Sequence, residues 1–186
     1  MSQPPVLLVI DVQKGFRDQK SWGLSANQDV YINIESLVEH WRTRGWPLVV
    51  VKHNSKNPNS TLAPSQPGND LEPFLDGLGD ILVEKSVNSA FYGSPDLHQW
   101  LSERGHQSLV ICGITTNYCC ETTARMAGNL GYNVEFAIDA TTAFPVALGE
   151  RLIPGEIVME MTAANLHGEF AIVTQTSELL EKYQTP

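Results

Sequence analysis

The chain has 186 residues, of which 42% are hydrophobic, so it can bury a substantial core and is not a disordered polymer. Its 12 Lys and Arg residues against 21 Asp and Glu residues give a formal net charge of −9, which argues against nucleic-acid and anionic-membrane partners. No apolar run reaches the ~18 residues of a membrane span, and the N-terminus lacks the basic region of a signal peptide. Three cysteines between positions 112 and 120 do not form a disulfide framework. We therefore expect one cytoplasmic domain over residues 1–186.

Short apolar runs alternate with amphipathic stretches along the whole chain. In chain order this pattern predicts a strand over 6–10, a helix over 31–44, strands over 47–51 and 81–83, a helix over 94–104, a strand over 108–111, a helix over 117–130, a strand over 134–138, a helix over 156–166, a strand over 170–173 and a helix over 177–183. Ser94 is the expected N-cap of the helix over 94–104, with Pro95 in its first turn. The order predicts an α/β fold: a three-layer α/β/α sandwich, Rossmann-like, with a six-stranded, mostly parallel sheet.

One long segment, residues 54–79, is irregular and rich in proline and glycine. A loop of this length inside a compact domain is typical of a functional segment or an interaction arm. A disordered surface excursion is the alternative.

Three chemically active side chains follow predicted strands. Asp11 follows the first strand, Lys85 follows the third, and Cys119 lies near the start of the helix after the fourth. In open α/β sheets, ligands bind outside the carboxyl ends of the strands. We therefore expect an acid, an amine and a thiol to converge on one crevice.

The three groups suit nucleophilic catalysis by a thiol. A helix N-terminus and the Lys85 ammonium both favour the thiolate of Cys119, and Asp11 can accept the thiol proton. Cys119 can also be a small buried hydrophobic residue, as is predicted for Cys112 and Cys120. Two further readings stay open: a thiol or redox sensor that uses Cys119 with Cys120 or Cys112, and a non-catalytic binding module.

Four segments of the chain resemble the isochorismatase-like cysteine hydrolases, a family that includes nicotinamidases and N-carbamoylsarcosine amidases. They are LLVIDVQKGF at 7–16, KSVNSAF at 85–91, GITTNYCCETTAR at 113–125, and the pair Asp139-Ala140. The third is similar to the family's nucleophile segment, and the match is collinear over almost the whole chain. The resemblance implies the isochorismatase-like hydrolase fold and the catalytic residues Asp11, Lys85 and Cys119.

The resemblance also implies a mechanism. A cis peptide bond between Ile114 and Thr115 is expected, with the backbone N–H groups of Thr115 and Cys119 as the oxyanion hole. The implied activity is hydrolysis of the C–N bond of a small linear amide or carbamoyl compound through a Cys119 thioester, without metal or other cofactor. An isochorismatase-type hydrolase of another small molecule is the alternative.

The segment after the second predicted strand departs from the nicotinamidases. Those enzymes carry a metal site of the type Asp-x-His-x-x-x-His there, whereas this chain has VKHNSKN at 51–57 and keeps only His53. We therefore predict no metal site and no nicotinamidase activity. His53 is expected to hydrogen-bond within the loop or to line the site.

Aromatic residues near these segments are candidates for the substrate pocket, because such a lining suits a small, flat or apolar acyl group. We expect two or three of the following to face a small-molecule substrate: Phe16, Trp22, Phe91, Tyr92, Tyr118 and Phe144. The resemblance further implies a homo-oligomer, either a dimer or a tetramer.

Overall fold

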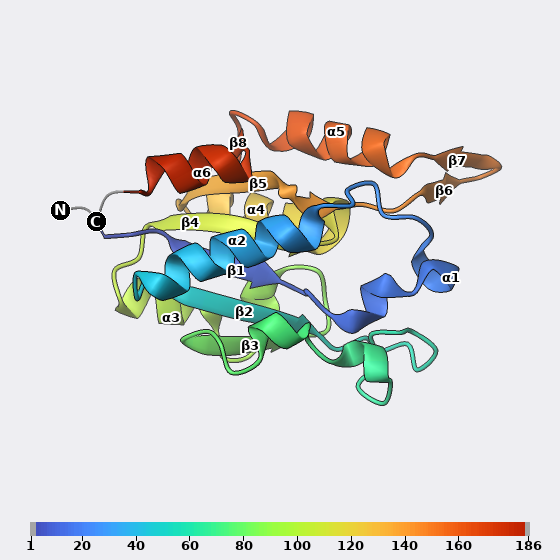
Figure 1. The fold of residues 1–186 in the computed structure, drawn as a ribbon, viewed down its shortest axis with the longest axis horizontal. Coiled ribbons are helices and arrows are strands. Elements are labelled where there is room, and N and C mark those ends of the chain that lie inside the picture. Colours follow the sequence, from blue (N-terminus) through green and yellow to red (C-terminus); the bar gives the residue numbers. More distant parts are fainter. Residues whose placement is uncertain (1–2, 185–186) are drawn as a thin grey trace.

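The sheet at the centre of the computed structural model, which describes residues 3–184, has six strands in the order β3-β2-β1-β4-β5-β8 (Figure 1). Each neighbouring pair is parallel. The strands are β1 (Val6–Ile10), β2 (Leu48–His53), β3 (Ile81–Lys85), β4 (Ser108–Ile114), β5 (Asn133–Thr142) and β8 (Ile172–Thr174). Because all six run in the same direction, their carboxyl ends share one edge of the sheet.

Helices cover both faces of this sheet. One face carries α2 (Val30–Thr43) and α6 (Thr176–Lys182), and the other carries α3 (Leu97–Glu103), α4 (Glu121–Asn129) and α5 (Gly155–Leu166) (Figure 1). The central strand β1 is buried on both sides: Leu7 and Val9 belong to one core, and Leu8 and Ile10 to the other. Alternate residues of a strand point to opposite faces, so an unbroken apolar run is what a doubly covered strand requires. The predicted three-layer α/β/α fold is confirmed.

The helix predicted over 94–104 begins later than expected. The side chain of Asp96 caps α3 by accepting a hydrogen bond from the backbone of Gln99, and the Ser94–Pro95 bond is cis. Ser94 exchanges two backbone hydrogen bonds with Glu84, so it extends the edge of β3. The prediction of Ser94 as N-cap is therefore wrong, because its backbone is already used by the sheet.

The region after β5 differs most from the prediction. An antiparallel hairpin of β6 (Val146–Leu148) and β7 (Arg151–Ile153) protrudes beyond the sheet edge (Figure 1). The last strand begins at Ile172 rather than at 170, because the backbone N–H groups of Phe170 and Ala171 both bond Leu166 and close the end of α5. The predicted helix over 117–130 is α4 preceded by a π-helical turn, η5 (Thr116–Cys120).

The segment 54–79 folds over the carboxyl ends of β1 and β2. It contains two short 3-10 turns, η2 (Pro67–Asn69) and η3 (Pro73–Leu75), and it buries Leu62 and Asn69. Its backbone forms hydrogen bonds with the backbone of Val12 and Lys14, through Glu72 and Asp70 respectively. The alternative of a disordered surface excursion is therefore wrong. No helix within residues 3–184 combines the length and the apolar character that crossing a bilayer needs.

Gly113 of β4 allows the backbones of β4 and β1 to approach each other closely near the carboxyl ends of the two strands. Its φ is +131°, and a Cβ atom there would overlap the backbone oxygen of Ile10. We expect Gly113→Ala to destabilise the protein by at least about 4 kcal/mol, measured by urea unfolding. Gly45→Ala is the control: its φ is +62° with no atom within 4 Å of the added carbon, so only the backbone cost of about 1–2 kcal/mol is expected. Equal losses in the two variants would contradict this account.

Candidate active site

Asp11, Lys85 and Cys119 meet at the carboxyl edge of the sheet. Asp11 directly follows β1, Lys85 ends β3, and Cys119 lies in η5 after β4. The Lys85 Nζ atom is 2.5 Å from Asp11 Oδ2 and 3.3 Å from Cys119 Sγ. The side chains of Asp11 and Lys85 have no solvent exposure, and Cys119 is 8% exposed. The three residues that the strand ends predicted to converge are thus in contact.

The backbone at Asp11 is held in an uncommon conformation. Its φ of 53° lies in the left-handed region, where residues other than glycine are rare and cluster at functional sites. Hydrogen bonds from Asp11 N to Val51 O at 2.9 Å and from Gln13 N to Asp11 O at 2.8 Å fix this turn. The turn directs the carboxylate across the strand ends towards Lys85.

Two more side chains contact this centre. His53, the last residue of β2, places Nδ1 3.3 Å from Lys85 Nζ. Asn88 places Oδ1 3.8 Å from Cys119 Sγ. His53 therefore lines the site, which was one of its two expected roles. The sequence analysis missed Asn88, although it stands inside the segment 85–91 that carries the lysine.

The ammonium of Lys85 takes the central position among three potential ligand atoms. An oxygen of Asp11, a ring nitrogen of His53 and the sulfur of Cys119 all lie within 4.8 Å of one another, and Lys85 Nζ contacts each residue. A second cation among these atoms would be repelled at close range. The cation that this arrangement holds is the lysine itself.

Burial and mutual charge decide the protonation of the three groups. Burial raises the pKa of Cys119, the Asp11 charge raises it further, and Lys85 offsets only part of both effects. Burial likewise raises the pKa of Asp11, against the lowering effect of Lys85. Burial alone would lower the pKa of Lys85, but Asp11 and Cys119 raise it overall. The effect of Lys85 has the expected direction, but burial and the Asp11 charge outweigh it, so the pKa of the thiol is raised overall.

One oxygen of the carboxylate remains available. Among the described residues, Asp11 Oδ1 has no hydrogen-bond partner, while Oδ2 binds Lys85. The buried hydroxyl of Thr115 is also unpaired within residues 3–184. An unpaired, fully buried polar atom costs free energy, so each of these two atoms is poised to gain a hydrogen bond. For Asp11 Oδ1 the donor can be the neighbouring thiol.

The predicted pocket aromatics separate into three groups. Trp22 and Phe144, with ring centroids 5.5 Å apart, line a cavity of about 280 Å³ together with Tyr118. Thr115, which bears the unpaired hydroxyl, lines the same cavity. Phe16 stacks on Phe144 at 6.1 Å and faces a second pocket.

The other two candidates lie elsewhere. Phe91 is buried in the core, where its ring stacks on Tyr132 at 5.9 Å. Tyr92 is 72% exposed and lines a shallow groove of about 470 Å³ with Val87 and Asn88. The structure therefore brings three of the six aromatic candidates around one cavity next to the Cys119 loop.

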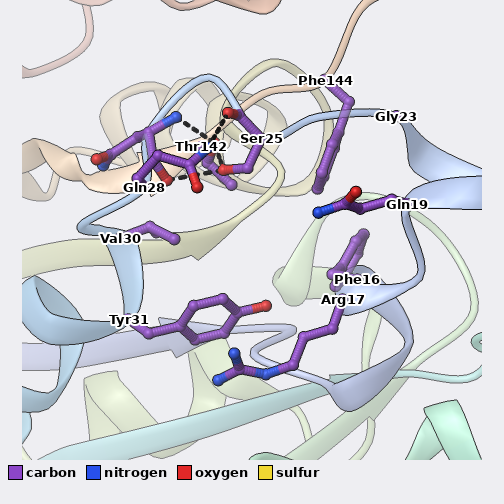
Figure 2. A pocket seen from close by; sticks show the side chains of 11 residues that line it. Phe16, Arg17, Gln19, Gly23, Ser25, Gln28, Val30, Tyr31, Thr142 and Phe144 are labelled. Atoms are coloured by element: carbon purple, nitrogen blue, oxygen red, sulfur yellow. Dashed lines mark hydrogen bonds between the residues drawn. The ribbon is translucent and has the colours of Figure 1, made fainter.

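The second pocket, of about 200 Å³, is polar and contains none of the three central residues (Figure 2). Arg17 and Tyr31 lie across it from Ser25 and Thr142, which share a hydrogen bond of 2.7 Å. The Arg17 guanidinium stands 3.9 Å from the centre of the Tyr31 ring and is already paired with Glu72. The polar groups of this pocket are paired with one another or with Glu72, and Cys119 does not line the pocket.

The remaining expectations for this region concern the backbone and the other thiols. The Ile114–Thr115 peptide bond is cis, as the resemblance implied. Cys112 and Cys120 are fully buried, and burial raises the pKa of both thiols. All three cysteines are free, so the structure contains no preformed disulfide for a redox sensor.

Comparison with known proteins gives the family. The isochorismatase domain matches residues 5–153, and the chain belongs to the isochorismatase family. The uncharacterized isochorismatase family protein YrdC of Bacillus subtilis is 32% identical over 98% of both chains. Nicotinamidase 3 of Arabidopsis thaliana is 29% identical over 96% of this chain and 88% of its own.

Solved structures agree with this assignment. A hydrolase of the isochorismatase family from Chromobacterium violaceum has 35% identity and a TM-score of 0.90, with 97% of this chain and 93% of that chain covered. N-carbamoylsarcosine amidase of Thermoplasma acidophilum shares the fold at 20% identity, with a TM-score of 0.72 over 94% of this chain and 97% of that chain. The protein is therefore an isochorismatase-family hydrolase with an Asp-Lys-Cys arrangement.

Proposed function

We propose that this hydrolase cleaves the C–N bond of a small linear amide or carbamoyl compound, with Cys119 as nucleophile. The observation that carries the proposal is the buried contact of one ammonium, Lys85, with both Asp11 and the Cys119 sulfur. A thiol needs a base to attack a carbonyl, and a buried carboxylate of raised pKa beside it can take the proton. Relatives named as a nicotinamidase and as streptothricin hydrolases support an amide or related C–N substrate.

In the proposed first half of the reaction, Cys119 becomes acylated. As Cys119 Sγ forms a bond to the substrate carbonyl carbon, its proton passes to Asp11 Oδ1. The backbone N–H groups of Thr115 and Cys119 stabilise the oxyanion, an effect worth roughly 3–4 kcal/mol per donor. The C–N bond breaks, and Asp11 returns the proton to the leaving amine or ammonia.

Water then completes the cycle. It attacks the thioester while Asp11 accepts its proton; the C–S bond then breaks, the acid leaves, and Asp11 passes the proton to Sγ to restore the thiol. Lys85 keeps its proton throughout, because Asp11 and Cys119 hold its pKa above the usual value despite burial. The cavity beside Thr115 and Tyr118 is the proposed place for the acyl group.

The test is ammonia release from a panel of small primary amides and N-carbamoyl compounds, nicotinamide included, with and without a chelator. We expect turnover of a linear member that is insensitive to the chelator, and a loss of roughly 10⁴- to 10⁶-fold in Cys119→Ala. Cys112→Ala is the matched control, since it removes a buried thiol that faces Leu8 rather than Lys85 and should keep activity. Full activity of Cys119→Ala would refute the proposal.

A further inference from the structure

His53 lies beside the reacting groups but has no part in the steps above. The Lys85 ammonium has three N–H donors, and three acceptors surround it: Asp11 Oδ2 at 2.5 Å, Cys119 Sγ at 3.3 Å and His53 Nδ1 at 3.3 Å. The lysine side chain is fully buried. Removal of the His53 ring would leave one N–H of the ammonium without an acceptor among the described residues, and such a loss is expensive for a buried charge.

We propose that His53 is a positioning residue for Lys85: its neutral ring accepts the third ammonium proton through Nδ1 and so fixes the ammonium between Asp11 and Cys119. The inference rests on the proposed function for its catalytic meaning. The contact between His53 and Lys85 does not depend on the proposed function, because it concerns only which atom holds the ammonium in place.

The surroundings of His53 keep the ring neutral. Burial lowers the pKa of His53, and the charge of Lys85 lowers it further, against a smaller opposite effect of Asp11. Nδ1 is the ring nitrogen that faces Lys85, and in a neutral ring with its proton on Nε2 this atom has a free lone pair for the ammonium.

The backbone of His53 is clamped from two directions by buried amides. The His53 N–H donates to Gln13 Oε1 at 2.9 Å, and the His53 carbonyl accepts from Gln13 Nε2 and from Asn69 Nδ2, both at 3.0 Å. Gln13 follows β1 and has no exposure, and Asn69 belongs to the loop 54–79 and is 4% exposed. These three hydrogen bonds fix the His53 backbone, and with it the point from which the ring reaches Lys85. This clamp also gives the long loop a role at the site.

The test compares His53→Asn with His53→Leu. Asparagine offers Oδ1 near the position of Nδ1, whereas leucine has a similar volume and no acceptor. The readout is the pH dependence of Cys119 alkylation by iodoacetamide, followed by peptide mass spectrometry. An ammonium that is no longer held in place stabilises the thiolate less well. We therefore expect the pH midpoint of Cys119 alkylation to rise by about one unit in His53→Leu and to stay within about 0.3 unit of wild type in His53→Asn.

The control is His106→Leu, which removes another buried ring, one that stacks on Trp100 at the opposite edge of the sheet. It should leave the midpoint unchanged. Urea unfolding of all three variants separates loss of stability from loss of positioning, since a merely structural role would lower stability without moving the midpoint. A wild-type midpoint in His53→Leu, or equal shifts in both His53 variants, would overturn the proposal.

A second measurement needs no variant and therefore does not depend on the folding of any mutant. Nitrogen-15 NMR of the wild-type imidazole should show the proton of His53 on Nε2, with the ring still neutral below pH 6.5. A proton on Nδ1 at neutral pH would overturn the proposal. Both readouts are independent of turnover, so a protein that hydrolyses no amide yet shows the shift and the tautomer would refute the proposed function and retain the role of His53.

Discussion

Asp11→Asn is expected to make Cys119 more reactive towards alkylation and to slow turnover strongly. The negative charge of Asp11 raises the pKa of the thiol, and Lys85 lowers it. When the carboxylate becomes a neutral amide, the ammonium loses its anionic partner and acts on the sulfur alone. We expect the alkylation midpoint of Cys119 to fall by about one to three pH units. Hydrolysis should fall by roughly 10²- to 10⁴-fold, because the base is gone.

Asp139→Asn is the matched control for this experiment. Asp139 is a partly buried carboxylate whose oxygen accepts hydrogen bonds from Thr176, and it does not contact Lys85. Its amide should leave the Cys119 midpoint at the wild-type value. If Asp11→Asn leaves the midpoint unchanged or raises it, Asp11 does not oppose the thiolate, and the assigned order of proton transfers fails.

Lys85→Met is expected to destabilise the protein strongly at neutral pH. It removes one member of an ion pair whose two side chains have no exposure, and it leaves the Asp11 carboxylate buried without a counterion. Breaking a buried pair in this way costs about 3–5 kcal/mol. Urea unfolding at pH 7 measures the loss.

The loss should depend on pH in a defined direction. Without Lys85, burial holds the folded-state pKa of Asp11 above its unfolded value, so the folded state binds more protons in the window between the two values. Stability contributed by such a group is present below the unfolded pKa and is lost as the pH rises through the folded one. The deficit of Lys85→Met against wild type should therefore shrink from pH 7 to pH 5.

The double variant Lys85→Met/Asp11→Asn provides the control. It removes both charges and retains most of the volume, so most of the stability at pH 7 should return. A single variant that is as stable as wild type at pH 7, or a deficit that grows as the pH falls, would show that the pair is not held as a buried ion pair.

The central strands could be predicted because their residues leave no other choice. A run such as VLLVI at 6–10 is apolar at every position, which fits only a strand covered on both faces. The convergence of Asp11, Lys85 and Cys119 followed from the parallel direction of those strands. The hairpin over β6 and β7 was not predicted, because its strands have three residues each and are largely exposed, so they carry little periodicity.

The details of the site depend on contacts that no local pattern records. The clamp on His53 joins Gln13 and Asn69, which are 56 positions apart, through a loop that contains no strand and only short 3-10 turns. The effect of Lys85 on the Cys119 pKa could be predicted, but a sequence does not show how deeply the thiol is buried, and burial has the largest effect on that pKa. Asn88 was missed for the same reason, since its contact with Cys119 is purely tertiary.

The most direct test of the central claim is to trap the covalent intermediate. The wild-type protein is mixed with an amide that it hydrolyses, quenched in acid within the first turnovers, digested and examined by peptide mass spectrometry. The account predicts the mass of the acyl group on the peptide that contains Cys119, and its absence in Cys119→Ala. Turnover with an unmodified Cys119 peptide at every quench time, together with an active Cys119→Ala variant, would contradict thioester catalysis by this site.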